Sequence, residues 1–229
     1  MILVLMDWPN ESVEYRRARD ELVEAEIELR RQEEAVASQR RALPFGGELK
    51  QDYEFESPAG IVHFTDLFRD GLNTLYLYNF MFVSGERGLP LEAACPDCTS
   101  IIDGMDGAIR HLLQRVNVAI VAKAPIEQFT AWGLSRGWRF APLYSSSRSA
   151  FNHDYNAEAA DGSQLPVAHV FSRAGGTIYH RWSSELMAAP RDEGQHPRHV
   201  DYMWPIWKVL DLAPEGRGTN WRPQREYAT

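Results

Sequence analysis

The stretch that decides the fold is residues 75–98, which reads LYLYNFMFVSGERGLPLEAACPDC. Its first part, Leu75–Phe82, is apolar and aromatic at every position but Asn79, which is typical of a strand buried on both faces of a sheet. A loop with two glycines and a proline follows, and the stretch ends in the only two cysteines of the chain, Cys95 and Cys98. The pattern predicts a buried strand, a loop, and a helix that begins at a Cys-x-x-Cys pair.

The segments after the cysteines alternate between helix and strand patterns. A helix is predicted over about 99–115, and the apolar run Val116–Ala122 predicts a second buried strand. The next helix, over about 125–136, starts with a proline, which suits a first helical turn because its missing amide proton has no role there. Trp138–Tyr144 is predicted as a further strand. Strands that alternate with helices in this way imply a parallel core with right-handed crossovers.

Two hairpins are predicted at the ends of this alternating core. One covers about 53–64, and the other joins strands at 165–171 and 177–182 through a turn with two glycines, which supply the positive φ of tight turns. The tail, 200–212, carries tryptophans at helical spacing and is predicted to close the core. The fold class is therefore α/β, with a mixed central sheet in three layers. A Cys-x-x-Cys pair after a buried strand makes this a thioredoxin-like fold.

The N-terminal part reads as one long charged helix from about Glu11 to Leu43, without glycine or proline. We interpret residues 1–44 as a helical extension and 45–229 as the thioredoxin-like domain. Its apolar seam is thin, so it either packs across its own domain or pairs with a second copy in a homodimer. The seam residues recur every seven positions: Tyr15, Leu22, Leu29 and Val36.

Composition limits the partners of the chain. It has 229 residues and a formal net charge of -8, and no dense basic stretch stands apart from acidic neighbours. Such a surface repels nucleic acid and anionic membranes, so we expect neither as a partner. We find no Gly-rich phosphate loop or dinucleotide fingerprint and expect no cofactor.

The N-terminus and the cysteine count suggest a compartment. Met1–Met6 is apolar but lacks a positive leader and a cleavage site, and no segment is apolar for long enough to span a bilayer. Two cysteines three positions apart close almost no loop, so they are poor structural staples. Free thiols of this kind fit a reducing cytoplasm, which is the predicted location.

The Cys pair has the features of a redox site. Cys95 is predicted at the helix N-terminus, where unpaired backbone N–H groups stabilise a thiolate and lower the pKa of a cysteine from about 8.5 to between ~3.5 and ~7.5. Pro96 suits the first turn. We expect Cys95 to attack a substrate and the more buried Cys98 to resolve the mixed disulfide. Asp97 is expected to oppose the thiolate, because its charge raises the pKa of Cys95.

Two other interpretations of the pair stay open. Half of a zinc site has the same spacing, but zinc takes four ligands and the chain has no second cysteine pair. We therefore predict no metal. Two cysteines that are merely packed in the core are the plainer alternative.

Further substrate contacts are predicted outside the helix. In thioredoxin-like proteins a cis-proline precedes the strand beside the Cys pair, and Leu165-Pro166 before the strand at 167–171 fits that position. An ordinary edge-strand proline is the alternative. Asn152 and Asp154 belong to a polar cluster that either lines a pocket near the thiols or forms a hydrogen-bonded loop.

Several segments together resemble an uncharacterised bacterial family, domain of unknown function 899, within the thioredoxin-like superfamily. The resemblance covers nearly the whole chain and implies the fold, whereas members are generally not assigned a reaction. The segments that carry it are Arg40–Pro44, Leu75–Phe82, Cys95–Cys98, Asp103–Ala108 and Phe151–Asp154.

The sequence departs from better-known thioredoxin-like proteins at two places. Thioredoxins commonly keep a buried acid on the central strand, and the matching position here is predicted to be Asn79, which cannot take a proton as a carboxylate does. Peroxiredoxins place a Thr or Ser three residues before the attacking Cys and a Pro four before that. Those positions here hold Glu92 and Gly88, which argues against a peroxiredoxin-type peroxide pocket.

We therefore expect a thiol–disulfide oxidoreductase that acts on a protein or small-molecule disulfide or thiol. The predicted catalytic residues are Cys95 and Cys98. A non-catalytic binding protein with the same fold, and a glutathione- or peroxide-dependent enzyme, are the alternatives. The predicted substrate contacts are Asn79, Pro96, Asp97, Asn152, Asp154, Leu165 and Pro166.

Overall fold

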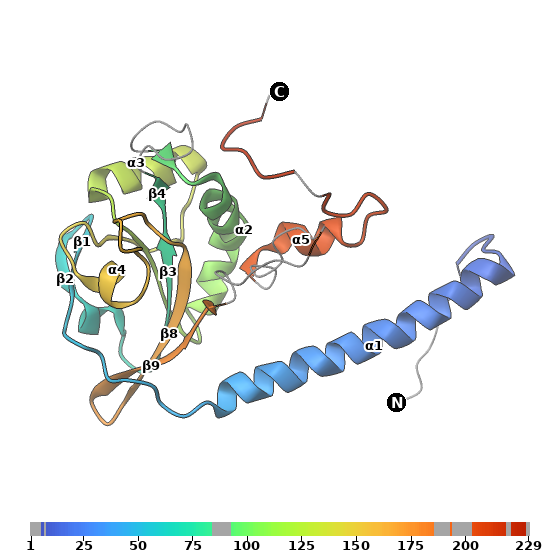
Figure 1. The fold of residues 1–229 in the computed structure, drawn as a ribbon, viewed down its shortest axis with the longest axis horizontal. Coiled ribbons are helices and arrows are strands. Elements are labelled where there is room, and N and C mark those ends of the chain that lie inside the picture. Colours follow the sequence, from blue (N-terminus) through green and yellow to red (C-terminus); the bar gives the residue numbers. More distant parts are fainter. Residues whose placement is uncertain are drawn as a thin grey trace. The chain divides into compact units, whose positions relative to one another are not determined.

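The computed structural model describes residues 6, 8–83, 93–185, 193, 203–218 and 221–227. Its contacts divide the chain into two compact units, Met1–Pro44 and Phe45–Thr229. The first unit contains one helix, α1 (Val13–Ala42), drawn in blue in Figure 1. The hydroxyl of Ser12 caps it by accepting a hydrogen bond from the Tyr15 amide at 3.0 Å.

Helix α1 carries mostly charged side chains, and none of its residues is buried. Ion pairs link successive turns, for example Arg17 to Glu21 at 3.3 Å and Arg19 to Glu26 at 3.0 Å. Such exposed pairs each contribute at most about 0.5 kcal/mol. No helix in the described parts of the chain is both long and apolar enough to cross a membrane.

The second unit is built on a seven-stranded mixed sheet, in the order β2-β1-β7-β6-β3-β8-β9 (Figure 1). Strand β6 lies parallel to β3 and β7, while β3 pairs antiparallel with β8 and β8 with β9. The hairpin β1–β2 extends the other edge. Its strands are β1 (Glu54–Ser57), β2 (Gly60–His63), β3 (Thr74–Phe80), β6 (Asn117–Ala122), β7 (Leu143–Ser145), β8 (Val167–Ala174) and β9 (Thr177–Ser183).

Short helices and a small ladder complete the unit. Strands β4 and β5 pair antiparallel just before the Cys pair. The mixed sheet between helical layers is the predicted three-layer thioredoxin-like fold, which is thereby confirmed. These elements are β4 (Phe82–Val83), β5 (Ala93–Ala94), η1 (Phe64–Leu67), α2 (Pro96–Leu112), α3 (Ile126–Arg136), α4 (Phe151–Asp154) and α5 (Pro205–Leu210).

The two faces of the sheet bury different cores. Helices α2, α3 and α5 cover one face, here called the cysteine face, where Cys98, Phe129 and Trp207 are fully buried. An aromatic core built around Phe64 and Phe151 covers the other face, here called the histidine face because His169 packs on it. Successive side chains of a strand point to opposite faces, so β3 and β8 contribute to both cores.

Two sequence expectations about this unit are wrong. The strand predicted at Trp138–Tyr144 is confined to Leu143–Ser145, because the Asp106 carboxylate accepts backbone N–H groups of Phe140 and Ala141 at 2.9 Å and holds that segment as a loop. The peptide bond before Pro166 is trans rather than cis.

Candidate functional site

Cys95 stands at the N-cap of α2, as the sequence predicts. Its backbone is extended, with φ -62° and ψ 127°, and its amide donates to the Met81 carbonyl at 2.9 Å. Its own carbonyl accepts from the amide and the hydroxyl of Thr99, at 2.9 and 2.8 Å. Pro96 occupies the first helical position, where no amide proton is needed. The backbone on both sides of Cys95 is therefore held by hydrogen bonds.

Both cysteines are free thiols and both are buried, Cys95 with 6% and Cys98 with 1% of its surface exposed. The Cys98 thiol donates a hydrogen bond that lowers the pKa of Cys95 below its usual value, and the backbone amides of Cys98 and Asp97 act in the same direction. Burial and the Asp97 charge oppose this shift but are outweighed. Cys95 is therefore the more acidic and the less buried of the two thiols.

Burial raises the pKa of Cys98 well above its usual value, and the neighbouring Cys95 adds to the effect. The hydroxyl of Tyr78 on β3 lies 3.3 Å from the Cys98 sulfur and donates to it. That hydrogen bond favours the Cys98 thiolate and so partly offsets the burial. Tyr78 is thus the polar group on the central strand that contacts the pair.

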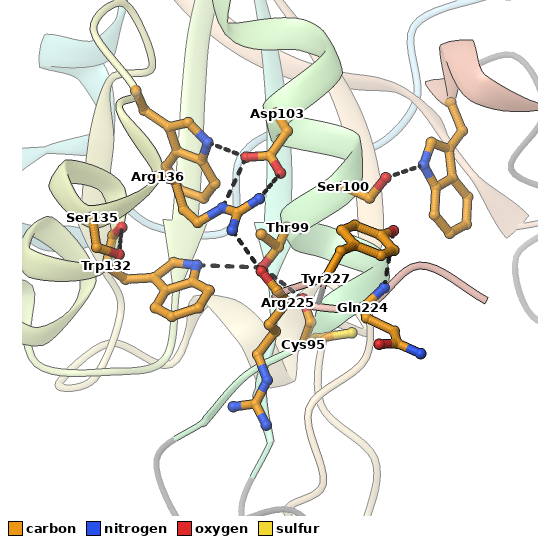
Figure 2. A network of polar contacts seen from close by, with 12 residues as sticks. Cys95, Thr99, Ser100, Asp103, Trp132, Ser135, Arg136, Gln224, Arg225 and Tyr227 are labelled. Carbon is orange, nitrogen blue, oxygen red and sulfur yellow. Dashed lines mark hydrogen bonds and ion pairs between the residues drawn. The ribbon is translucent and has the colours of Figure 1, made fainter. Parts of the chain in front are cut away.

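A network of polar contacts fixes α2 against α3 (Figure 2). The Trp132 indole donates to the Thr99 hydroxyl at 3.3 Å, which in turn holds the Cys95 carbonyl. One helical turn further, Asp103 accepts from Arg136 and from the Trp138 indole, the latter at 2.8 Å. The N-terminal half of α2 is therefore held in place by bonds from side chains of α3 and the loop after it.

The C-terminal segment 221–227 lies over the start of α2. Arg222 pairs with Asp97 at 2.7 Å, and Arg136 donates to the Arg225 carbonyl at 2.6 Å. A cavity of about 540 Å³ lies between this segment and the helix, lined by Pro96, Trp132 and residues 223–226. Figure 2 labels Gln224 and Arg225 of this segment together with Cys95. The cavity therefore adjoins the first turn of α2, of which Cys95 is the N-cap residue.

Three predicted site residues lie on the histidine face instead. Asn79 points away from Tyr78, and its amide donates to Asn152 at 3.3 Å; Asn152 also accepts from Ser146 at 2.7 Å. Asp154 binds Lys50 and the Tyr53 hydroxyl, which hold the pKa of its carboxyl at about 2. The position thought to replace the buried acid of thioredoxins therefore does not face the thiols.

Leu165 and Pro166 stand where β8 begins. The register pairs Val167 with Asn79, so this end of β8 lies beside the end of β3 that leads toward the Cys pair. Their side chains, however, line a cavity on the histidine face together with His169. Glu92 and Gly88, the positions compared with peroxiredoxins, lie outside the described residues.

Sequence reasoning missed the residues that hold the pair. Tyr78 lies in a run that is apolar throughout, so no alternation tells which of its side chains face the helix. Arg222 and Trp132 lie 125 and 33 residues from their partners Asp97 and Thr99, distances at which pairings leave no local pattern. Within the described residues, no three or more His, Cys, Asp or Glu side chains are grouped so as to hold a metal ion.

The mixed sheet and the reduced pair at the N-terminus of α2 define a thioredoxin-like protein. The chain belongs to the bacterial family of proteins of unknown function DUF899, whose sequence model matches residues 7–228. No curated protein matches the chain.

The solved structures similar to this chain include peroxiredoxins. Thioredoxin peroxidase I of Plasmodium yoelii has 18% identity and a TM-score of 0.44, over 74% of this chain and 91% of that one. The reduced 2-Cys peroxiredoxin of Plasmodium vivax has 18% identity and a TM-score of 0.43, over 72% and 98%. Peroxidoxin BcpB of Mycobacterium tuberculosis has 12% identity and a TM-score of 0.44, over 73% and 98%.

Proposed function

We propose that this protein is a thiol–disulfide oxidoreductase in which Cys95 attacks and Cys98 resolves. The observation that carries the proposal is the asymmetry of the pair. One thiol sits at a helix N-terminus with its pKa lowered by a neighbouring hydrogen bond, while the other is fully buried with its pKa raised. A low-pKa thiol beside a protonated partner is the arrangement that thiol–disulfide exchange uses.

The proposed reaction has two exchange steps. The Cys95 thiolate attacks one sulfur of a substrate disulfide, forms a mixed disulfide and releases the other sulfur as a thiolate, which takes up a proton. Cys98 then loses its proton and attacks the Cys95 sulfur, which releases the second substrate thiol. The substrate disulfide is reduced to two thiols, and the Cys95–Cys98 pair is oxidised to a disulfide. An external dithiol, oxidised in turn, returns the pair to the reduced form.

Tyr78 supports the second step. Its hydroxyl donates to Cys98 at 3.3 Å and can stabilise the negative charge that develops on the sulfur when Cys98 loses its proton. We propose Tyr78 as a positioning residue for the resolving thiol, because no charged group in the described residues contacts Cys98.

The cavity between α2 and the C-terminal segment is the proposed substrate side. Pro96 and Trp132 give it an apolar wall beside Cys95, and Arg225 and Glu226 give it both signs of charge. Asp97 borders the same side but is paired with Arg222. Such a lining fits a peptide or small thiol of mixed polarity better than a strongly charged partner.

The test uses the full chain and two matched variants. We expect Cys95 to alkylate with iodoacetamide faster than a free cysteine at pH 7, and a mild disulfide oxidant to yield a Cys95–Cys98 disulfide that has lost two hydrogen atoms. Cys98→Ser should trap a mixed disulfide at Cys95, and Cys95→Ser should trap none. Cys95 alkylation no faster than that of the unfolded chain, with no internal disulfide, would reject the proposal.

The burial of Cys95 favours one alternative, a binding protein that keeps its thiols reduced and does not turn over a substrate. Only 6% of Cys95 is exposed, and the C-terminal segment is tied down beside it. Turnover separates the two: reduction of an insulin-type disulfide by the wild type with a dithiol reductant supports the enzyme. Turnover with glutathione-linked or peroxide substrates alone would support a small-molecule thiol enzyme instead.

A further inference from the structure

A second cavity, of about 600 Å³, lies on the histidine face at the ends of β8 and β9. This volume is typical of small-molecule sites in proteins. Its walls come from the start of β8, the end of β9, Tyr155 and Asn156 after α4, and the segment before β1 that contains Glu48. All of these residues belong to the unit Phe45–Thr229, and neither cysteine is among them.

Backbone hydrogen bonds hold the Glu48 wall of the cavity against β9. The Gly46 amide donates to the His180 carbonyl at 2.9 Å. Beyond Glu48, the Leu49 amide donates to the Ile178 carbonyl at 2.8 Å. A Cβ atom at position 46 would lie 2.7 Å from the His180 carbonyl oxygen, so this close approach requires glycine. The wall is therefore formed by the fold itself before any ligand binds.

Most of the remaining lining is apolar. Leu165, Pro166 and Val167 give an aliphatic wall where β8 begins, and Tyr155 adds an aromatic ring. The Tyr155 ring is itself stacked on Phe151, with centroids 4.8 Å apart, so its position is fixed by the aromatic core of this face. Such walls favour a ligand with an apolar body.

The two histidines of the lining carry no positive charge at pH 7. Burial lowers the pKa of both rings, that of His169 to about 3. The Ser183 Oγ lies 2.6 Å from His169 Nδ1 and 2.7 Å from His180 Nε2, so the two rings share one hydroxyl. Neutral imidazoles of this kind cannot compensate a negative charge in the same cavity.

The full charges of the described lining are both negative. Glu48 and Glu185 belong to it, whereas no lysine or arginine of the described lining does. The Glu185 carboxylate is close enough to His180 to act against the lowering of its pKa by burial. Neither carboxylate forms an ion pair with a described residue. Lys50 follows this wall, but its ammonium group is paired with Asp154 at 2.6 Å.

We propose that this cavity binds a small organic ammonium ion with an apolar body. The ammonium group lies near Glu48 and Glu185 and supplies the positive charge that the described lining lacks, while the apolar walls cover the body of the ligand. An anion meets like charge there, and a neutral molecule leaves both carboxylates without a counter-ion. The site is separate from the Cys pair, and the proposal does not depend on the redox reaction.

The test is calorimetry on the full chain with three ligands that differ only in their end group: tryptamine, tryptophol and indole-3-propionate. At pH 7 they present a cation, a neutral alcohol and an anion on the same indole body. We expect saturable binding of tryptamine, about tenfold weaker binding of tryptophol, and still weaker binding of indole-3-propionate. The preference for tryptamine should shrink at high salt, because salt screens exposed charges.

Removal of the two charges tests their role directly. Both glutamates are exposed, so the double variant Glu48→Gln with Glu185→Gln keeps the side-chain shapes without disturbing a buried contact. It should weaken tryptamine binding about tenfold and leave tryptophol binding unchanged. Glu127→Gln, at an exposed position of α3 outside this lining, is the matched control and should bind tryptamine as the wild type does.

A further variant tests the location of binding. Leu165 is 40% exposed, so Leu165→Trp narrows the cavity from its surface side and should weaken binding of tryptamine and tryptophol alike, by about tenfold. Leu134→Trp, at a 72% exposed position of α3, is its control. Absence of saturable tryptamine binding, equal binding of either other ligand, or tryptamine binding that the double variant or Leu165→Trp leaves intact would each overturn the proposal.

Discussion

The two faces of the central sheet differ in whether their buried polar groups have hydrogen-bond partners. On the cysteine face, two described side chains hold the pair by hydrogen bonds: Tyr78 donates to Cys98, and Thr99 donates to the Cys95 carbonyl. On the histidine face, His169 keeps one buried nitrogen without a described partner. The same strands supply both faces, since neighbouring residues of one strand point in opposite directions. A single sheet therefore carries the Cys pair on one face and His169 on the other without shared side chains.

The largest expected effect concerns the cysteine face alone. Cys95→Ser should abolish disulfide reduction and the fast alkylation, because a serine hydroxyl is not ionised at neutral pH. Its unfolding free energy should stay within about 1 kcal/mol of wild type, since the two side chains are nearly isosteric. An insulin-reduction assay and a urea titration measure the two quantities. Residual turnover in Cys95→Ser would place the chemistry elsewhere.

The next largest effect is expected on the histidine face, where protonation of His169 makes the unfolding free energy depend on pH. The folded-state pKa of His169 lies at about 3, below the unfolded value of 6.5, so the unfolded chain binds a proton that the folded chain does not. Its contribution to stability is complete above pH 6.5 and is lost as the pH falls toward 3, by at most about 1.4 kcal/mol per pH unit. Urea titrations between pH 6.5 and 4.5 measure the slope.

The titratable groups around His169 also contribute to the pH dependence of the unfolding free energy. His180 has a lowered pKa and acts in the same direction, and Tyr155, whose pKa is raised by burial, stays neutral throughout. His169→Gln should flatten the slope, whereas Cys95→Ser should keep it. Equal flattening in both variants would mean that the two faces are coupled.

Variants of two adjacent residues of β3, Tyr78 and Asn79, are expected to have smaller effects, and these effects differ in kind. Tyr78→Phe removes the donor to Cys98 and should slow release of the mixed disulfide about tenfold, as expected for a lost hydrogen bond to a charged group. Asn79→Ala instead removes the buried bond to Asn152 and should lower the unfolding free energy by about 1–3 kcal/mol. Stopped-flow measurement of the resolving step distinguishes the two variants. If Asn79→Ala slowed this step more than Tyr78→Phe does, Tyr78 would not be the residue that faces the Cys pair.

The smallest effect comes from the pair at the surface of the site. Arg222→Ala leaves the Asp97 charge without its ion pair, which should raise the pKa of Cys95 and slow its alkylation at pH 7 about twofold. Arg222→Lys keeps the charge and should behave as wild type.

The pH profile of alkylation distinguishes charge from access in these variants. A shifted midpoint reports the charge of Asp97, and high salt should reduce that shift by screening. A higher plateau rate with an unshifted midpoint would instead mean that Arg222 mainly holds the C-terminal segment over Cys95.

The sequence was sufficient for the core of the fold. The largely apolar runs at β3 and β6 identify buried strands, and the proline after Cys95 marks the start of α2. Strand β7 is shorter than predicted because Asp106 binds the preceding segment from more than 30 residues away. An interaction of that range leaves no trace in the local pattern of residues.

The sites were only partly predictable for a related reason. Spacing alone places Cys95 and Cys98 together, but the face on which Asn79 lies is set by the register of β3, and its apolar run shows no alternation. The hydrogen bonds that join His169, Ser183 and His180 depend on the pairing of β8 with β9. They also depend on an irregularity in that pairing between Val170 and Phe171. Neither histidine has a partner in the sequence pattern.

The contact between Asp97 and Arg222 has a consequence for synthesis of the protein. The two residues are 125 positions apart, so at about 5–20 residues per second the ribosome makes the arginine roughly 6–25 s after the aspartate. Throughout that interval the nascent chain carries both thiols without the segment that later borders them. Oxidants and chaperones meet the cysteines in that interval in a form that the finished protein does not present.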